Sequence, residues 1–178
     1  MDGPKALPPL YRASVPVLVA VLDRIGAELA KAQGQLGTGF ATALEQRPAA
    51  GMMPAARQVA TTIQFTLRIA HPLAGKRPPE LRGPLDGPGL IARVAAARKH
   101  LTALPPKAFE GAEGRVVRAQ AGFAQLELTG EAYLHEFGLP NLYFHQAMAH
   151  VALKQAGVIL GKADFDGKHD YPEGFTFG

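Results

Sequence analysis

Two histidines, His145 and His150, lie in the aromatic and apolar stretch FGLPNLYFHQAMAH at residues 137–150. Imidazole is the side chain best suited to proton transfer near neutral pH, and it is also a common metal ligand. Pairs of histidines that bind one metal ion from a helix are three or four residues apart. These two are five residues apart and would point about 140° away from each other on a helix. The pair therefore does not predict a shared metal site.

The helix predicted over 140–156 determines where these two rings point. Its apolar face is centred on Phe144, Met148 and Val151, with Ala147 and Ala152 on the flanks. His145 lies at the margin of this face, near the positively polarised start of the helix, which favours a neutral imidazole. It is either a structural histidine with one hydrogen bond or a pocket residue that acts as a base or a single ligand. His150 is expected to face solvent.

Most other residue types with catalytic chemistry are absent or poorly placed. The chain has no Cys, which excludes disulfides, thiol nucleophiles and Cys-bound metal. Its single serine, Ser14, precedes a helical pattern and is predicted to cap that helix. The segment DFDGKHD lacks the spacing of a calcium loop. The remaining histidines are expected to be structural or solvated: His71, His100, His135 and His169.

Polar residues on the second predicted helix are further site candidates. Gln58, next to Val59, can turn toward the interior, and Gln64 can contact Arg68 one turn later. A buried amide or guanidinium needs hydrogen-bond partners, so either side chain would mark a polar cavity. The alternative, that these residues lie on an exposed helix face, is equally compatible with the sequence.

Four amphipathic patterns predict the elements that carry these residues. Helices are expected over about 14–32, 54–71, 89–104 and 140–156. The segments RVVRAQ and FAQLEL predict a small β-hairpin before the last helix. The tail, residues 161–178, has no period and is expected either to fold back over the helices or to fray. The chain, 1–178, is thus expected to be one all-α domain, a four-helix bundle.

Composition narrows the classes of function. The net charge is +4, but the basic residues never form a run, so no nucleic-acid partner is expected. The early apolar segment VPVLVAVL is too short to span a membrane, and the start MDGPK is not basic enough for a secretory signal. The absence of Cys suits a reducing compartment. A cytoplasmic protein without membrane contact is therefore expected.

The chain resembles one known family in four separate segments, which occur in the order LYRASVPVLVAVLDRI, MMPAARQV, LPPKAFEGAEGRVV and FGLPNLYFHQAMAHVALKQAGVILGKADFDG. This is an uncharacterised bacterial domain family of the DinB/YfiT-like superfamily of helical bundles. The resemblance spans nearly the whole chain. It implies a DinB-like four-helix bundle with an up-down-down-up arrangement that is often a homodimer.

The resemblance also implies where a site would lie. Better-known members of the superfamily look like metalloenzymes: a His on the second helix and an H-x-x-x-H pair on the last helix hold a divalent ion, and some transfer a low-molecular-weight thiol. His145 matches the first member of that pair, but Ala149 stands at the second, and the second helix begins with Arg57 and Gln58. Gln64 stands where relatives in the family often have an acidic residue. No three-histidine metal centre, and no metal or other cofactor, is therefore expected.

The expected site is instead an inter-helix pocket for a small ligand. By the resemblance, its residues are Tyr11, Gln58, Gln64, Asn141 and His145. Two other functions stay open: a divalent-metal-dependent hydrolase or thiol transferase that uses His145, and a non-enzymatic dimeric interaction module. The sequence predicts neither a substrate nor a reaction.

Overall fold

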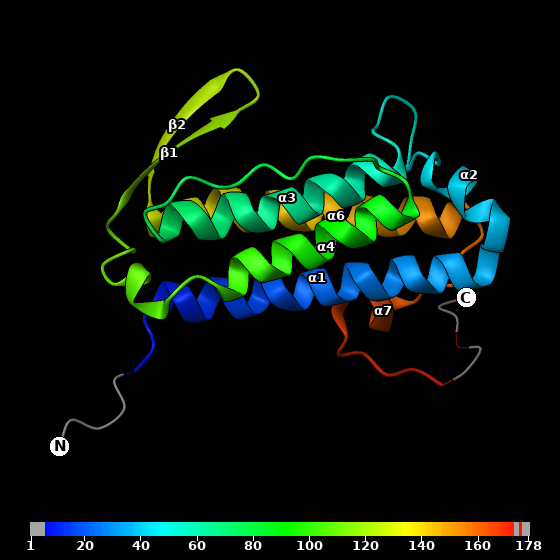
Figure 1. Ribbon diagram of the computed structural model, residues 1–178, viewed down its shortest axis with the longest axis horizontal. Helices are drawn as coiled ribbons and strands as arrows, with labels where there is room; N and C mark the ends of the chain where they lie inside the picture. Colours follow the sequence, from blue (N-terminus) through cyan, green and yellow to red (C-terminus); the bar gives the residue numbers. More distant parts are fainter. Residues whose placement is uncertain (1–5, 173–174, 176–178) are drawn as a thin grey trace.

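Four long helices form the body of the protein. The computed structural model describes residues 6–172 and 175. The helices are α1 Pro9–Leu36, α3 Ala55–Leu73, α4 Gly87–Thr102 and α6 Leu139–Gln155. α1 and α6 run in one direction and α3 and α4 in the other, because the segment between α3 and α4 returns along the bundle (Figure 1). The predicted all-α fold class is confirmed, and the order of directions is up-down-down-up.

The first helix begins five residues earlier than predicted. Pro9 lies in its first turn, where a missing N–H group is no loss and the fixed φ of proline suits the helix. Ser14 is therefore not the predicted cap, because it lies inside the helix. Its side chain is buried and its hydroxyl donates a hydrogen bond to the Leu10 carbonyl. The helix ends at Leu36, and the residue after it, Gly37, has a positive φ of 53° that favours glycine.

The core lies where the apolar stripes of the helices face one another. α3 packs against α6, α4 and α1, and α1 also packs against α4. Burial of each large aliphatic side chain stabilises the fold by about 1.5–3 kcal/mol. The side chains that α1 and α3 place in the core, each at most 1% exposed, include Leu18, Leu22, Ile25, Leu29, Ile63 and Leu67.

The buried face of α6 differs from the predicted one. Its buried residues are Leu142, Gln146, Ala149, Ala152 and Leu153, whereas Phe144 is 50% exposed. The prediction placed the face by the largest apolar side chains. In the structure Ala149 points inward instead, together with Ala152, which the prediction placed on the flank, and this side of α6 packs against α3. Relative to the prediction, the buried face of α6 is therefore turned about the helix axis, which changes the surroundings of both His145 and His150.

A β-hairpin stands out from one end of the bundle (Figure 1). Its strands, β1 Val116–Ala121 and β2 Ala124–Thr129, are antiparallel, which confirms the predicted hairpin before the last helix. Gly122, with a φ of 59°, and Phe123 form the two-residue connection. Buried Val117 attaches the base of the hairpin to the core.

Shorter elements complete the chain. They are η1 Gly37–Gly39, α2 Phe40–Leu44, η2 Pro106–Phe109, α5 Gly130–Ala132, the π-helical turn η3 Tyr133–Gly138 and α7 Lys162–Asp166. α7 packs against α1, so the first part of the tail folds back over the bundle. Residues 173, 174 and 176–178 of the tail lie outside the described residues. Within the described part of the chain, every helix is too short or too polar to cross a membrane.

Candidate functional site

The two histidines of α6 lie in two different clusters, one against α3 and one against α1. In the first, His145 Nδ1 is 2.8 Å from Oε1 of Gln58, near the start of α3. An amide oxygen only accepts hydrogen bonds, so Nδ1 carries the proton. Gln58 is 1% exposed, and its Nε2 donates to the Met53 carbonyl at 3.3 Å. The buried amide therefore fixes the orientation of the imidazole.

Aromatic rings enclose His145. Its ring stacks on Phe65, with 5.6 Å between the centroids, and meets Phe144 edge-on at 5.2 Å. Burial lowers the pKa of His145, and the guanidinium of Arg68 lowers it further. The ring is thus kept neutral, with Nδ1 donating and Nε2 carrying the lone pair.

The five residues predicted for the pocket are only partly brought together. Gln58 bonds His145, and Asn141 lies one turn earlier on α6, where its Nδ2 donates to the Phe137 carbonyl at 2.7 Å. Tyr11 packs edge-on against Phe109, with 5.3 Å between the ring centroids. Gln64 holds the segment between α3 and α4: its Nε2 donates to the Pro79 carbonyl at 2.8 Å, and its Oε1 accepts from the Leu81 N–H at 3.1 Å. A pocket formed by all five stays a prediction.

The residues around His145 do not fit a three-histidine metal centre. The nearest polar partner of the ring is an amide, and Ala149, four residues later on α6, is fully buried and has no donor atom. Within residues 6–172 and 175, no three His, Cys, Asp or Glu side chains are grouped as metal ligands would be.

The second cluster centres on His150, which was expected from the sequence to face solvent. That expectation is wrong: its side chain is only 13% exposed, and Nδ1 is 2.7 Å from Oε1 of Glu28 on α1. The rotation of α6 explains the error, because it turns this position toward α1. The edge of the imidazole also meets the ring of Phe165 on α7, at 5.8 Å between centroids.

Glu28 is the most buried charged residue of this cluster, with 1% exposure. Burial raises its pKa, while the hydrogen bond and the charge of His150 oppose that rise. Within the described residues, its second oxygen, Oε2, has no hydrogen-bond partner. The carboxyl and the imidazole are thus joined by a single hydrogen bond of 2.7 Å, the usual length for a charge-assisted pair. A buried carboxylate–imidazole pair of this kind is typical of sites that move or hold a proton.

A neighbouring ion pair fixes α7 beside the cluster. Lys31 Nζ on α1 lies 3.0 and 3.1 Å from the two carboxylate oxygens of Asp164, and the Gly161 N–H donates to Asp164 Oδ2 at 2.7 Å. Burial alone would raise the pKa of Asp164, but these hydrogen bonds outweigh it and the pKa is lowered. Gln146 adds a further link, because its Nε2 donates to the Phe165 carbonyl at 3.1 Å.

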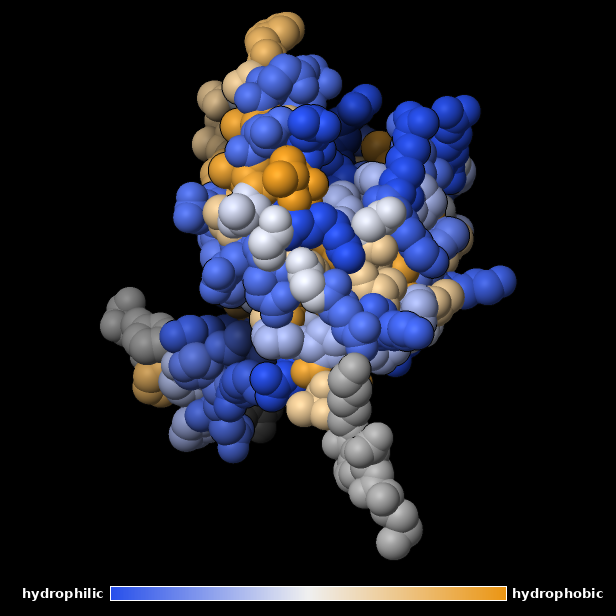
Figure 2. Space-filling view, turned by 90° about the vertical axis from the view of Figure 1, so that its left-hand side faces the viewer, coloured by the Kyte–Doolittle hydropathy of each residue, from blue (hydrophilic) through white to orange (hydrophobic). Residues whose placement is uncertain are grey.

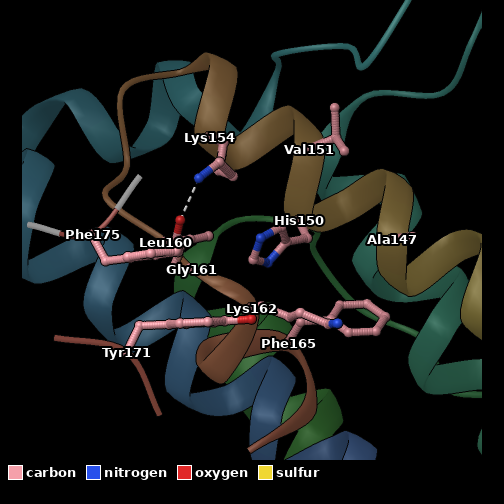
Figure 3. Close-up of a pocket in the computed structure, with 10 residues that line it drawn as sticks. All are labelled: Ala147, His150, Val151, Lys154, Leu160, Gly161, Lys162, Phe165, Tyr171 and Phe175. Atoms are coloured by element: carbon pink, nitrogen blue, oxygen red, sulfur yellow. Dashed lines mark hydrogen bonds between the residues drawn. The ribbon is translucent and has the colours of Figure 1, made fainter. Parts of the chain in front are cut away.

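A cavity of about 520 Å³ opens beside His150, between α6, α7 and the tail. The imidazole projects from α6 into the space in front of Phe165, and the tail residue Tyr171 lies on the far side (Figure 3). Lys154 is tied to the Leu160 carbonyl at the edge of the cavity. Most of the wall is apolar, and its charged residues are lysines; the lining includes Ala147, Val151, Leu160, Lys154 and Lys162.

One sequence signal for this cluster was overlooked. Glu28 lies three residues after Ile25 and four before Ala32, within the apolar stripe of α1. An acidic residue inside such a stripe must be neutralised or paired when it is buried. The sequence does not show that its partner comes from the last helix, because 121 intervening residues separate them.

A known protein family matches most of this chain. The sequence profile of the family "Domain of unknown function (DUF1993)" matches residues 10–166. The chain belongs to this family. Both histidine clusters lie within the matched DUF1993 region, which extends from α1 to the end of α7.

A solved structure shares the fold of this DUF1993 chain. It is the crystal structure of a DinB family member protein from Shewanella denitrificans, with 25% sequence identity and a TM-score of 0.79. The alignment covers 92% of this chain and 94% of that protein. The DUF1993 bundle is therefore DinB-like. No protein of curated function matches the chain.

Proposed function

We propose that this DinB-like protein binds a small organic acid with an apolar body in the cavity beside His150. The observation that carries the proposal is the buried Glu28–His150 pair at the edge of a cavity of about 520 Å³. Ligand sites are typically cavities of this order with mostly apolar walls and a few fixed polar groups. The proposed ligand site lies between α6 and α7, and a pocket formed by the five residues expected from sequence stays a separate prediction.

The charges around the cavity support an acidic ligand. Lys154 and Lys162 contribute to its lining, and an ammonium group attracts a carboxylate. His150 uses Nδ1 to bond Glu28, which leaves Nε2 for a ligand. When Glu28 is ionised it holds the proton at Nδ1, and Nε2 can then accept a proton from an acid. The apolar wall would bury the remainder of such a molecule.

The test uses benzoate and hexanoate as probes, with neutral benzamide as the matched comparison. We expect saturable shifts of the His150 imidazole resonances in NMR titrations with both acids. Benzamide should bind up to about fivefold more weakly, because an exposed charge pair contributes up to about 1 kcal/mol. His150→Gln assigns the resonances. Lys162→Ala should weaken benzoate binding, whereas Lys107→Ala, a distant exposed lysine, should not. Shifts that are absent for both acids, or equal for benzamide, would refute the proposal.

We also propose that the protein is a cytoplasmic homodimer. Tyr143 and Phe144 are adjacent on the outer face of α6 and are 39% and 50% exposed, which supports an apolar interface on that helix. The absence of Cys supports a reducing compartment. Light scattering after size-exclusion chromatography tests the dimer, and Phe144→Glu should convert it to a monomer. A mass of one chain for the wild type at all concentrations would contradict it.

A further inference from the structure

Arginines that are far apart in sequence meet in one groove on the other side of the bundle. Four of them line a cavity of about 690 Å³ between the second half of α3, the segment 74–86 and the hairpin: Arg68, Arg77, Arg82 and Arg118. Two more, Arg57 and Arg93, line an adjoining cavity of about 370 Å³ that shares Arg68. Figure 1 shows the hairpin and the segment 74–86 across the bundle from α7, and the arginine groove lies between these two parts of the chain and α3.

Fixed backbone holds the arginines in place. Gln64 bonds the segment 74–86 at Pro79 and Leu81. Arg93 adds two hydrogen bonds to the same segment, to the carbonyls of Leu81 and Gly83, both at 2.7 Å. The segment that carries Arg77 and Arg82 is therefore tied to α3 and α4 at four points, and the groove is already formed without a ligand.

Arg68 lies at the centre of the groove. Its guanidinium lies 4.6 Å over the ring of Phe65, and its Nη2 donates to the Gln120 carbonyl on β1 at 3.1 Å. Tyr133 fixes the backbone at this point, because its hydroxyl donates to the Arg68 carbonyl at 2.6 Å. Burial raises the pKa of Tyr133 to about 12, so the hydroxyl keeps its proton. Arg68 thus links the bundle to the hairpin and presents its remaining N–H groups to the cavity.

Negative charge in the groove does not balance these cations. Among the described residues that line the larger cavity, Glu80 is the one acid, and it pairs with Arg82 at 3.2 Å. Glu127 on β2 pairs with Arg118 at 2.7 Å. Both pairs are highly exposed and so are weak. Gathered like charges repel one another, and a bound anion would relieve that repulsion.

We propose that the arginine groove binds a small molecule that carries two or more linked phosphate groups. The planar guanidinium fork donates two parallel hydrogen bonds to a phosphate, and several forks on different elements can engage successive phosphates. The volume suits a ligand rather than a single ion. The end of the molecule that faces the viewer in Figure 2 carries many hydrophilic side chains with apolar ones among them. The four arginines of the larger cavity converge on one enclosed space from α3, the segment 74–86 and β1, whereas nucleic acid requires an extended basic stripe.

The test is calorimetric titration with inorganic pyrophosphate at low and high ionic strength. We expect saturable binding at one site that weakens with salt. Arg77→Ala/Arg118→Ala should weaken it by about 100-fold or more, because each of the two charged hydrogen-bond donors contributes roughly tenfold or more. Both side chains lie at the surface, so the fold should persist, which the melting temperature checks. Arg77→Lys/Arg118→Lys, which keeps the charge but loses the fork, should give an intermediate loss.

A control variant outside the groove and two alternative ligands, citrate and duplex DNA, distinguish a phosphate site from other sites. Lys99→Ala/Lys107→Ala removes the same charge from exposed positions outside the groove and should change binding less than twofold. The proposal is overturned if pyrophosphate does not bind, or if both double alanine variants weaken it equally. It is also overturned if citrate binds as tightly, which would indicate a carboxylate site. Tighter binding of short duplex DNA, lost in Arg77→Ala/Arg118→Ala, would replace the small molecule with nucleic acid.

Discussion

His145 and His150 project from the same helix, yet they have partners of opposite character. His145 is bonded to Gln58, an amide that neither gains nor loses a proton in water. His150 is bonded to Glu28, a carboxyl whose charge can change. Aromatic rings enclose the first, and the second borders a cavity of about 520 Å³. The two imidazoles are chemically the same, so their different roles come from their partners and surroundings. Gln58 orients His145, whereas Glu28 and His150 form a pair that can hold a proton.

The largest effect is expected when the His150 cluster loses one member. His150→Leu leaves the Glu28 carboxyl buried without a partner, and breaking a buried pair in this way costs about 3–5 kcal/mol of unfolding free energy. Glu28→Leu should be similarly destabilising, because it leaves the imidazole of His150 without its carboxyl partner. The double variant Glu28→Leu/His150→Leu should recover most of the loss, because two apolar side chains need no partners. Urea denaturation of the four proteins at neutral pH measures the cycle.

Two results of the Glu28→Leu and His150→Leu double-mutant cycle would contradict this prediction. If each single variant costs less than about 1 kcal/mol, the pair behaves like a surface salt bridge and its burial has no energetic consequence. If the double variant is as unstable as the sum of the single ones, the two side chains act independently.

A smaller loss is expected in the His145 cluster. Gln58→Ala removes the acceptor of the Nδ1–H group and leaves that donor half-buried, at a cost of about 1–3 kcal/mol. Gln33→Ala, at an exposed position of α1, serves as the control and should change stability by less than about 0.5 kcal/mol. The same urea denaturation measures both. Equal losses in the two variants would show that the hydrogen bond between Gln58 and His145 does not orient the ring.

The two clusters should also respond to pH in opposite directions. Folding raises the pKa of Glu28 above 4.5, so its contribution is fully present below pH 4.5 and is lost as the pH rises through the folded pKa. Folding lowers the pKa of His145 below 6.5, so its contribution is present above pH 6.5 and is lost as the pH falls through the folded pKa.

Two variants separate these contributions. In Glu28→Gln, the stability relative to wild type should improve as the pH rises above 4.5, because only the wild type loses stability there. In His145→Gln, the relative stability should improve as the pH falls below 6.5. His71 also has a pKa lowered by burial, but it is present in both variants and cancels. Urea denaturation across this range measures the difference, and slopes of the same sign would contradict the assignment.

The His145 cluster was partly predictable from the sequence, whereas the His150 cluster was not. The fold followed from periodic apolar residues, and the proximity of Gln58 to His145 was expected from the family resemblance. The His150 cluster was missed because side-chain size misplaced the face of α6, where Ala149 rather than Phe144 is buried. The arginine groove was missed because its residues are scattered in sequence. Such contacts between distant residues depend on the exact rotation and packing of elements, which periodicity does not determine.

The smallest expected difference concerns the aromatic edges of the two clusters. Phe144 meets His145 edge-on at 5.2 Å, and Phe165 meets His150 edge-on at 5.8 Å. An edge-on aromatic contact contributes about 0.5–1.5 kcal/mol, so Phe144→Leu and Phe165→Leu should each cost no more than this in urea denaturation. The NMR pH titration of the His145 ring gives a sharper measurement. Burial and Arg68 hold the pKa of His145 low, so its midpoint should stay nearly unchanged in Phe144→Leu. A large shift of that midpoint would show that the edge-on contact with Phe144 controls the protonation of His145.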